Sequence, residues 1–219
     1  MIDGKIPGMT AHLSMNTVIH AAVRRDLGRF RAALAAFPVG SSDRAADLNW
    51  AWQNLDAQLH HHHEGEETIF WPALKKLGAD LALVSDLDGE HRRMAEAMVG
   101  ARTAMTALAG QPDEERRDTA QAAFAELTEV VETHFAHEER DLEPMMAKVR
   151  DTPEMKEAGN AIRRTMSPAE AGAYLTWLGD GADPDAKAFL RHEIPAPVLF
   201  IFTGLFGRSY RRGIAPVWA

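Results

Sequence analysis

One arrangement of side chains occurs twice in the chain and restricts its fold more than any other feature. A histidine is followed four residues later by a pair of glutamates, and a proline stands six residues after the first glutamate. The copies occupy residues 62–72 and 134–144. A histidine and a glutamate four residues apart project from the same face of an α-helix. The repeat therefore predicts two helices, each with a pair of metal-binding side chains on one face.

Four long helices account for most of the chain, because apolar residues recur with the helical period and no alternating strand pattern interrupts them. The predicted helices span residues 10–37, 43–77, 80–109 and 112–149. Gly78 suits a helix end, and Pro112 suits a first helical turn. Loops of a few residues make successive helices antiparallel. We therefore expect an all-α fold, an up-down-up-down four-helix bundle over residues 10–149.

The apolar face of each predicted helix contains a histidine, and two of the faces also contain a glutamate. These residues are His20, His62, Glu66, His91, His134 and Glu138. One histidine on an apolar face is usually a hydrogen-bonded core residue. A buried glutamate without a partner, however, costs several kcal/mol, and no lysine or arginine lies on these faces to offset either carboxylate. Because metal ions would offset both, we interpret the six side chains as metal ligands.

Any of the four consecutive histidines at residues 60–63 could be the ligand of this helix, and the helical register distinguishes between them. His62 follows Leu59 by three residues and precedes Glu66 by four, so it shares their face. The other three histidines are expected to support the ligands from outside or to face solvent. They are His60, His61 and His63. Whether either of the last two contributes to the site stays open, and His137 receives the same interpretation because it lies off the apolar face.

Composition excludes several kinds of partner and site. The formal net charge is −8, so no basic excess is present to bind nucleic acid. The absence of cysteine excludes disulfides and thiolate metal sites. The first residues lack the apolar core of a secretory signal. The longest apolar run, residues 194–206, contains two prolines and is too short to span a bilayer. We expect a cytoplasmic protein without a membrane span.

The chemical types of the predicted ligands limit which metal ions the site can bind. Imidazole and carboxylate without thiolate suit iron, manganese or zinc. Six ligands are too many for one tetrahedral zinc, whereas two ions that share the two glutamates would use all six. Ferritin-like carboxylate centres carry Glu-x-x-His motifs, and here only Asp88-x-x-His91 comes near that motif. We therefore expect a two-metal centre of another kind.

The predicted ligands follow one another on successive helices in the order His20, His62-x-x-x-Glu66, His91 and His134-x-x-x-Glu138. This order resembles the hemerythrin-like family, also called HHE cation-binding domains, and the resemblance covers about residues 10–149. It implies two iron ions in a non-haem, oxo- or hydroxo-bridged centre, for which zinc or manganese are possible substitutes. It also implies a division of the ligands. His20 and His62 would bind one iron, His91 and His134 the other, and Glu66 and Glu138 would bridge them.

Two departures from the family bear on function. Oxygen-carrying hemerythrins have a second histidine one turn after the ligand of the third helix, where this chain has Ala95. Their last carboxylate is an aspartate five residues after the histidine, whereas Glu138 stands at four. A centre with one imidazole fewer than these carriers leaves a coordination position at iron open. We expect a reaction with hydrogen peroxide or nitric oxide. The alternative is a module that binds, stores or senses O2, NO or iron without turnover.

Residues 150–219 lie outside the resemblance and are expected to form a short helical extension. Ser167-Pro168-Ala169-Glu170 is a capping box at the start of a helix, and Asp183 begins another. The apolar residues 194–202 favour a hairpin that packs on the bundle or on a second subunit, which would give a homodimer. A membrane-surface anchor is the less favoured alternative. We assign His192 to this packing.

Overall fold

The computed structural model describes residues 13–219, whose regular structure is entirely helical, without a strand in that range. The first part comprises α1 (Met15–Ala35), α2 (Ser42–Gly65), η1 (Glu66–Phe70), α3 (Trp71–Lys76), α4 (Leu81–Gly110), α5 (Glu114–His137), η2 (Glu138–Leu142) and α6 (Glu143–Val149). The second part comprises α7 (Pro153–Arg164), α8 (Pro168–Gly179), α9 (Pro184–Glu193), α10 (Ala196–Ile201), η3 (Phe202–Phe206), α11 (Arg208–Gly213) and η4 (Ala215–Trp218). The prediction of an all-α chain is confirmed.

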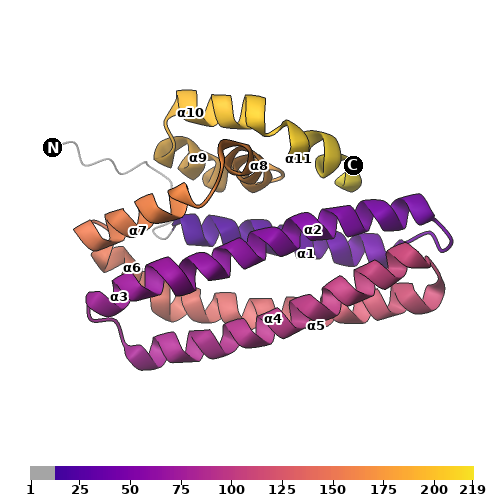
Figure 1. Ribbon diagram of the computed structural model, residues 1–219, viewed down its shortest axis with the longest axis horizontal. Helices are drawn as coiled ribbons and strands as arrows, with labels where there is room; N and C mark the ends of the chain where they lie inside the picture. The colour runs from indigo at the N-terminus through magenta and orange to yellow at the C-terminus, as the bar shows by residue number, and fades with distance from the viewer. Residues whose placement is uncertain (1–12) are drawn as a thin grey trace.

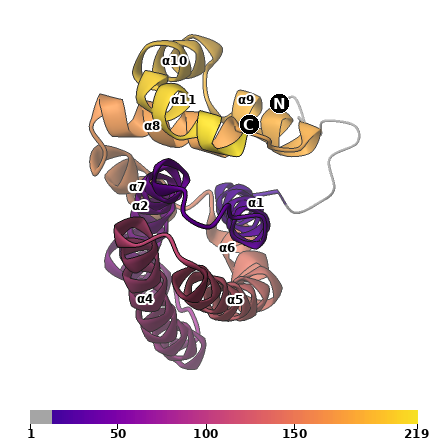
Figure 2. The same cartoon turned by 90° about the vertical axis from the view of Figure 1, so that its right-hand side faces the viewer.

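Four long helices, α1, α2, α4 and α5, lie side by side, and we call them the bundle (Figures 1 and 2). Their apolar faces meet around three fully buried rings, those of Phe30, Trp52 and Phe124. The ring centroid of Phe124 lies 4.6 Å from that of Phe30 and 5.2 Å from that of Trp52. His20 precedes Phe30 by about 15 Å along α1 at the helical rise per residue. The apolar core and the histidines therefore occupy different levels of the bundle.

Several helix ends differ from the predicted ones by a few residues. The side chain of Ser14 caps α1, and the predicted start at Thr10 lies outside the described residues. Pro112 was expected in the first turn of its helix, but α5 begins later because the carboxylate of Asp113 caps it. Gly78 follows α3 with a φ of +83°, a left-handed conformation that ends the helix as predicted.

Each of the two helices that carry the repeat contains one π-helical turn. In η1 the N–H of Trp71 donates to the carbonyl of Glu66, and in η2 the N–H of Glu143 donates to the carbonyl of Glu138. A proline follows each donor. Proline has no N–H, and its ring crowds the carbonyl four residues before it, which favours the wider turn. Both π-turns therefore begin at the first glutamate of the repeat.

Residues 153–218 form an extension that covers one side of the bundle (Figure 1). The capping box at Ser167 is present as predicted, with hydrogen bonds in both directions. α7 is not among the predicted helices, although Thr152 caps it and Pro153 occupies its first turn. His192, which we assigned to the packing of the extension, is exposed.

The apolar residues 194–202 do not form a hairpin. They enter α10, which continues into η3, and this helix packs on α8 (Figure 1). Gly172 permits the close contact, because a side chain there would collide with Phe206 and with the carbonyl of Phe202. On the outer side, Phe200 stays 78% exposed. Within residues 13–219 no single helix is long and apolar enough to cross a membrane. Taken together, α9 and the continuous helix of α10 and η3 have the required length and apolar composition, but the two are bent by 114° relative to each other.

A buried carboxylate fastens α8 to the bundle. Asp26 on α1 is 1% exposed and accepts a hydrogen bond of 2.7 Å from the indole N–H of Trp177 on α8. Arg25 and Arg29 donate to the same carboxylate at 2.9 and 3.0 Å. Arg29 also binds Asp180, after the end of α8, at 2.8 Å. The extension is thus held on α1 by a polar network as well as by apolar packing.

Candidate metal centre

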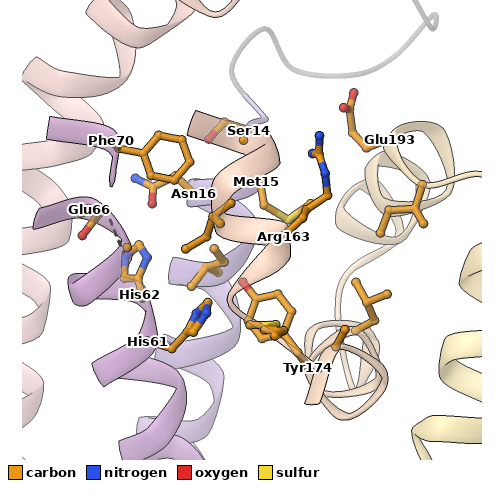
Figure 3. A pocket seen from close by; sticks show the side chains of 18 of the residues that line it. Ser14, Met15, Asn16, His61, His62, Glu66, Phe70, Arg163, Tyr174 and Glu193 are labelled. Carbon is orange, nitrogen blue, oxygen red and sulfur yellow. Dashed lines mark ion pairs between the residues drawn. The ribbon is translucent and has the colours of Figure 1, made fainter. Parts of the chain in front are cut away.

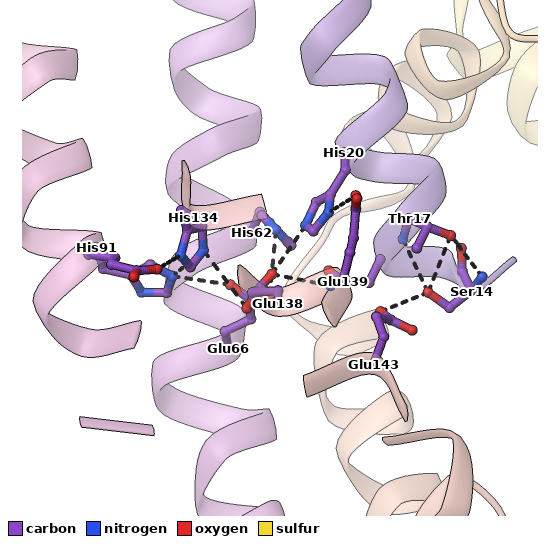
Figure 4. A network of polar contacts seen from close by, with 12 residues as sticks. Ser14, Thr17, His20, His62, Glu66, His91, His134, Glu138, Glu139 and Glu143 are labelled. Atoms are coloured by element: carbon purple, nitrogen blue, oxygen red, sulfur yellow. Dashed lines mark hydrogen bonds and ion pairs between the residues drawn. The ribbon is translucent and has the colours of Figure 1, made fainter. Parts of the chain in front are cut away.

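Seven buried side chains converge inside the bundle, and Figure 4 labels all of them except His63. They are His20 from α1, His62 and His63 from α2, Glu66 from η1, His91 from α4, His134 from α5 and Glu138 from η2. Six of them are the residues that the sequence analysis proposes as ligands. None of the seven is more than 8% exposed. Their donor atoms form three overlapping groups, and within each group the atoms lie within 4.8 Å of one another.

The carboxylate of Glu66 faces two different histidines. Its Oε1 lies 3.6 Å from Nε2 of His62, and its Oε2 lies 3.4 Å from Nε2 of His91. His62 comes from α2 and His91 from α4, so the two oxygens point to different parts of the cluster. A carboxylate in this position is able to bridge two metal ions.

Glu138 repeats this arrangement with the other two helices. Its Oε2 lies 3.2 Å from Nε2 of His20, and its Oε1 lies 3.8 Å from Nε2 of His134. The cluster consequently has two halves. The half we call the α1 half contains His20 and His62, and the half we call the α4 half contains His91 and His134. Each of the two carboxylates directs one oxygen to each half.

His63 does not face solvent, which is one of the two positions expected for it. Its ring is 8% exposed and stacks on that of His91, with centroids 4.3 Å apart. Its donor atom lies in one group with those of His91 and His134, so it belongs to the α4 half. Adjacent residues on a helix point about 100° apart. His62 therefore faces α1 while His63 faces α4. The prediction assumes one apolar face per helix, so it selects only one of these two histidines.

Phe135 stands in the second copy of the repeat where His63 stands in the first. Its ring stacks on that of His20, with centroids 3.7 Å apart and planes inclined by 7°. The α1 half therefore has a phenyl ring where the α4 half has an imidazole. As a result, the α1 half contains two imidazoles and the α4 half three.

The second glutamate of each repeat orients a histidine of another helix. Nδ1 of His91 lies 2.8 Å from Glu67, and Nδ1 of His20 lies 2.9 Å from Glu139. A carboxylate accepts hydrogen bonds, so Nδ1 carries the proton and Nε2 presents its lone pair to the cluster. Glu67 and Glu139 have no role in the sequence-based prediction, although their repetition after each predicted ligand is a usable indication.

Glu90 on α4 supports the remaining side of the cluster. Its carboxylate accepts hydrogen bonds from Nδ1 of His134 at 3.0 Å and from Nδ1 of His137 at 2.9 Å. His137 thus reaches the cluster only through Glu90. His61 lies 2.9 Å from the hydroxyl of Thr165, and His60 is exposed, so neither faces the cluster.

Burial sets the charge of several of these groups. It lowers the pKa of His62 and of His63 well below the ordinary value, and the neighbouring histidines lower them further. Both rings are therefore neutral, which is the form that binds a metal. Burial and the nearby Glu138 raise the pKa of Glu66 well above its ordinary value. Burial acts in the same direction on Glu138, but contact with the surrounding histidines outweighs it and lowers the pKa.

Several nitrogen and oxygen atoms of the cluster that could bind a metal have no hydrogen-bond partner among residues 13–219. They are Nε2 of His20, His62 and His63, Oε2 of Glu66 and Oε1 of Glu138. In addition, the Nε2 atoms of His91 and His134 face each other at 3.1 Å with their lone pairs. A buried polar atom without a partner costs about 1–3 kcal/mol, and a cation among these atoms removes that cost. The residues therefore fit a metal centre with nitrogen and oxygen ligands.

One family description matches the part of the chain that contains the cluster. Residues 17–146 match the hemerythrin HHE cation-binding domain. The chain belongs to the hemerythrin HHE family. All seven buried side chains lie within this HHE domain, and the extension follows it. No curated protein sequence and no solved structure matches the chain.

Proposed function

We propose that this HHE domain holds two iron ions within an up-down-up-down four-helix bundle. The ligands would be His20 and His62 for one ion, His63, His91 and His134 for the other, and Glu66 and Glu138 as bridges. Support for two ions comes from the carboxylates, each of which directs one oxygen to each half of the cluster. Zinc and manganese accept the same donors, and iron is preferred because of the family resemblance.

The unequal number of imidazoles supports a reactive centre. With His63 counted, the α4 half contains three imidazoles although Ala95 offers none, so an open position would not lie there. The shortage lies instead in the α1 half, where Phe135 stands. A metal with fewer protein ligands has room for an external molecule. A cavity also reaches His62 and Glu66 from outside, which favours access to this half.

The reaction that this arrangement supports best is the disproportionation of hydrogen peroxide at the α1 half. Iron, when bound, supplies the redox change. Glu66 and Glu138 would hold the two ions together, and Glu139 fixes the orientation of His20. Nitric oxide is a second small molecule that fits the same position.

Peroxide turnover tests this function. We expect the iron-loaded protein to release O2 from hydrogen peroxide over many cycles, measured with an oxygen electrode. Phe135→His adds an imidazole to the α1 half, so this variant should lose turnover by about tenfold or more while it keeps its iron. Phe135→Leu adds no ligand and serves as the control. A carrier or sensor would instead give the spectrum of a bound ligand without sustained turnover, and this result would exclude the enzymatic proposal.

The assignment of His63 is tested by comparison with His60. We expect His63→Ala to lose about half of the bound iron, because it removes one of three imidazoles from the α4 half. His60→Ala, an exposed neighbour in the same histidine run, should keep full metal content. Metal analysis by atomic emission measures both variants. Equal iron in the two proteins would remove His63 from the ligand set.

A binding or sensing module without turnover is the second candidate. The observation in its favour is that α7, α8 and α10 of the extension line the cavity together with His62. Occupancy near His62 would therefore alter contacts of the extension directly. The peroxide experiment separates this candidate from the enzyme.

A further inference from the structure

A cavity of about 820 Å³ lies between the bundle and the extension. His62 and Glu66 lie at one end of it, Glu193 lies at the other, and Tyr174 lies between them (Figure 3). Its walls come from both parts of the chain, because α1, α2, α7, α8 and η3 all contribute lining residues. The extension thus creates this space beside the candidate metal centre.

The size of the cavity exceeds what a peroxide or a diatomic molecule needs. A water molecule occupies about 30 Å³ in the liquid, so the space would hold on the order of 25 waters. Sites for organic ligands usually have volumes of about 300–1,000 Å³. The volume therefore matches an organic molecule rather than a small oxidant alone.

The walls of the cavity are mainly apolar. Side chains of Met15, Phe70, Ile162, Leu175 and Phe202 line it. These residues belong to five different elements, so apolar surface surrounds the space instead of forming one flat patch. Water in such a space makes few hydrogen bonds, and an apolar molecule that displaces it gains binding free energy.

Polar groups occupy defined positions at the two ends of the cavity. Arg163 and Glu193 line the rim and are exposed, so their opposite charges balance there. Further in, the Tyr174 hydroxyl has no hydrogen-bond partner within residues 13–219. Burial raises the pKa of Tyr174, and the charge of Glu66 raises it further, so the hydroxyl remains a donor. An anion would lose its hydration between the apolar walls, so they favour an uncharged molecule.

We propose that this cavity binds an uncharged, largely apolar organic molecule whose hydroxyl or carbonyl oxygen accepts a hydrogen bond from Tyr174, close to His62. The position would make this molecule a neighbour of whatever reacts at the α1 half. The binding site itself does not depend on peroxide turnover, so the two proposals are tested separately.

Calorimetric titration with 2-naphthol tests the binding site. This probe has an apolar two-ring body and one hydroxyl group. We expect saturable binding to the full-length protein, and binding at least about tenfold weaker to its charged analogue naphthalene-2-sulfonate. No binding of 2-naphthol, or equal binding of the two probes, would overturn the proposal.

Two matched substitutions on α8 locate the site. Ala171 lines the cavity, so Ala171→Trp fills it and should weaken 2-naphthol binding at least about tenfold. Ala169, on the same helix, is exposed and lies outside the lining, so Ala169→Trp should bind as the original protein does. Equal affinity of both variants would place the probe elsewhere. Circular dichroism and metal content show whether both variants are folded.

Tyr174→Phe provides a test that leaves the shape of the cavity intact. Loss of one hydrogen bond should weaken 2-naphthol about two- to tenfold. Naphthalene, which has no oxygen, should bind both proteins equally. An unchanged affinity for 2-naphthol would remove Tyr174 from the site and overturn the proposed orientation. Peroxide turnover measured on the same samples shows separately whether the proposed reaction stands or fails.

Discussion

Replacement of Glu138 by alanine is expected to lower the bound iron from about two ions per chain to fewer than one. Glu138 is fully buried, and its two oxygens face His20 and His134 in different halves of the cluster. If Glu138 bridges the two ions as proposed, its loss removes a ligand from both at once. It also removes one of the two negative charges that offset the metal charge inside the bundle. Metal analysis after gel filtration measures the effect.

The control for this prediction is Glu126→Ala, which removes an exposed glutamate from α5. It changes the net charge by the same amount and should leave the iron content unaltered. A variant without the Glu138 carboxylate that still held two ions would contradict the bridging role. A variant that held one ion would show that the halves bind independently.

Replacement of Asp26 by alanine is expected to destabilise the protein by about 3–5 kcal/mol, since it leaves buried donors without their acceptor. The indole N–H of Trp177 and the guanidinium groups of Arg25 and Arg29 all donate to this carboxylate. At this chain length such a loss should lower the melting temperature by about 10 °C. Thermal unfolding followed by circular dichroism measures it.

Asp26→Asn separates the charge from the hydrogen bond in this network. The amide oxygen still accepts from Trp177, so we expect a smaller loss of stability than with alanine. Neither substitution removes a proposed iron ligand, and the metal content of the folded protein should stay the same. Identical melting temperatures for the original protein and the alanine variant would show that apolar packing alone holds α8 on α1.

The helices and six residues of the cluster could be predicted because each rests on local periodicity. His91 and His134, for example, recur on the apolar faces of their own helices, and the repeat selects Glu66 and Glu138 by spacing. The seventh residue, His63, could not be selected in this way. A periodic face shows one direction of burial, whereas α2 contacts two neighbouring helices.

Other features depend on contacts between distant residues, which periodicity does not reveal. Asp26 looks like a surface residue because arginines stand near it in the sequence, and its partner Trp177 is 151 residues away. Glu67 is half-exposed and gains its role only from His91 on α4. The cavity likewise exists only after the extension has packed on the bundle.

The contacts of the cluster follow an approximate internal two-fold symmetry. One helical hairpin consists of α1 and α2, and the other consists of α4 and α5. Glu67 of the first hairpin holds His91 of the second, and Glu139 of the second holds His20 of the first. Each hairpin thus orients one of the histidines that we propose as ligands on the other, so neither hairpin has a fully oriented half of the cluster by itself.

This symmetry is broken where an imidazole stacks on one side and a phenyl ring stacks on the other, at His63 and Phe135. In a fully symmetric centre the two ends would be chemically equivalent. A single pair of corresponding positions makes them distinct here. If the proposed reaction takes place at the α1 half, exchange of these two side chains should transfer it to the α4 half, while the backbone that carries both halves stays the same.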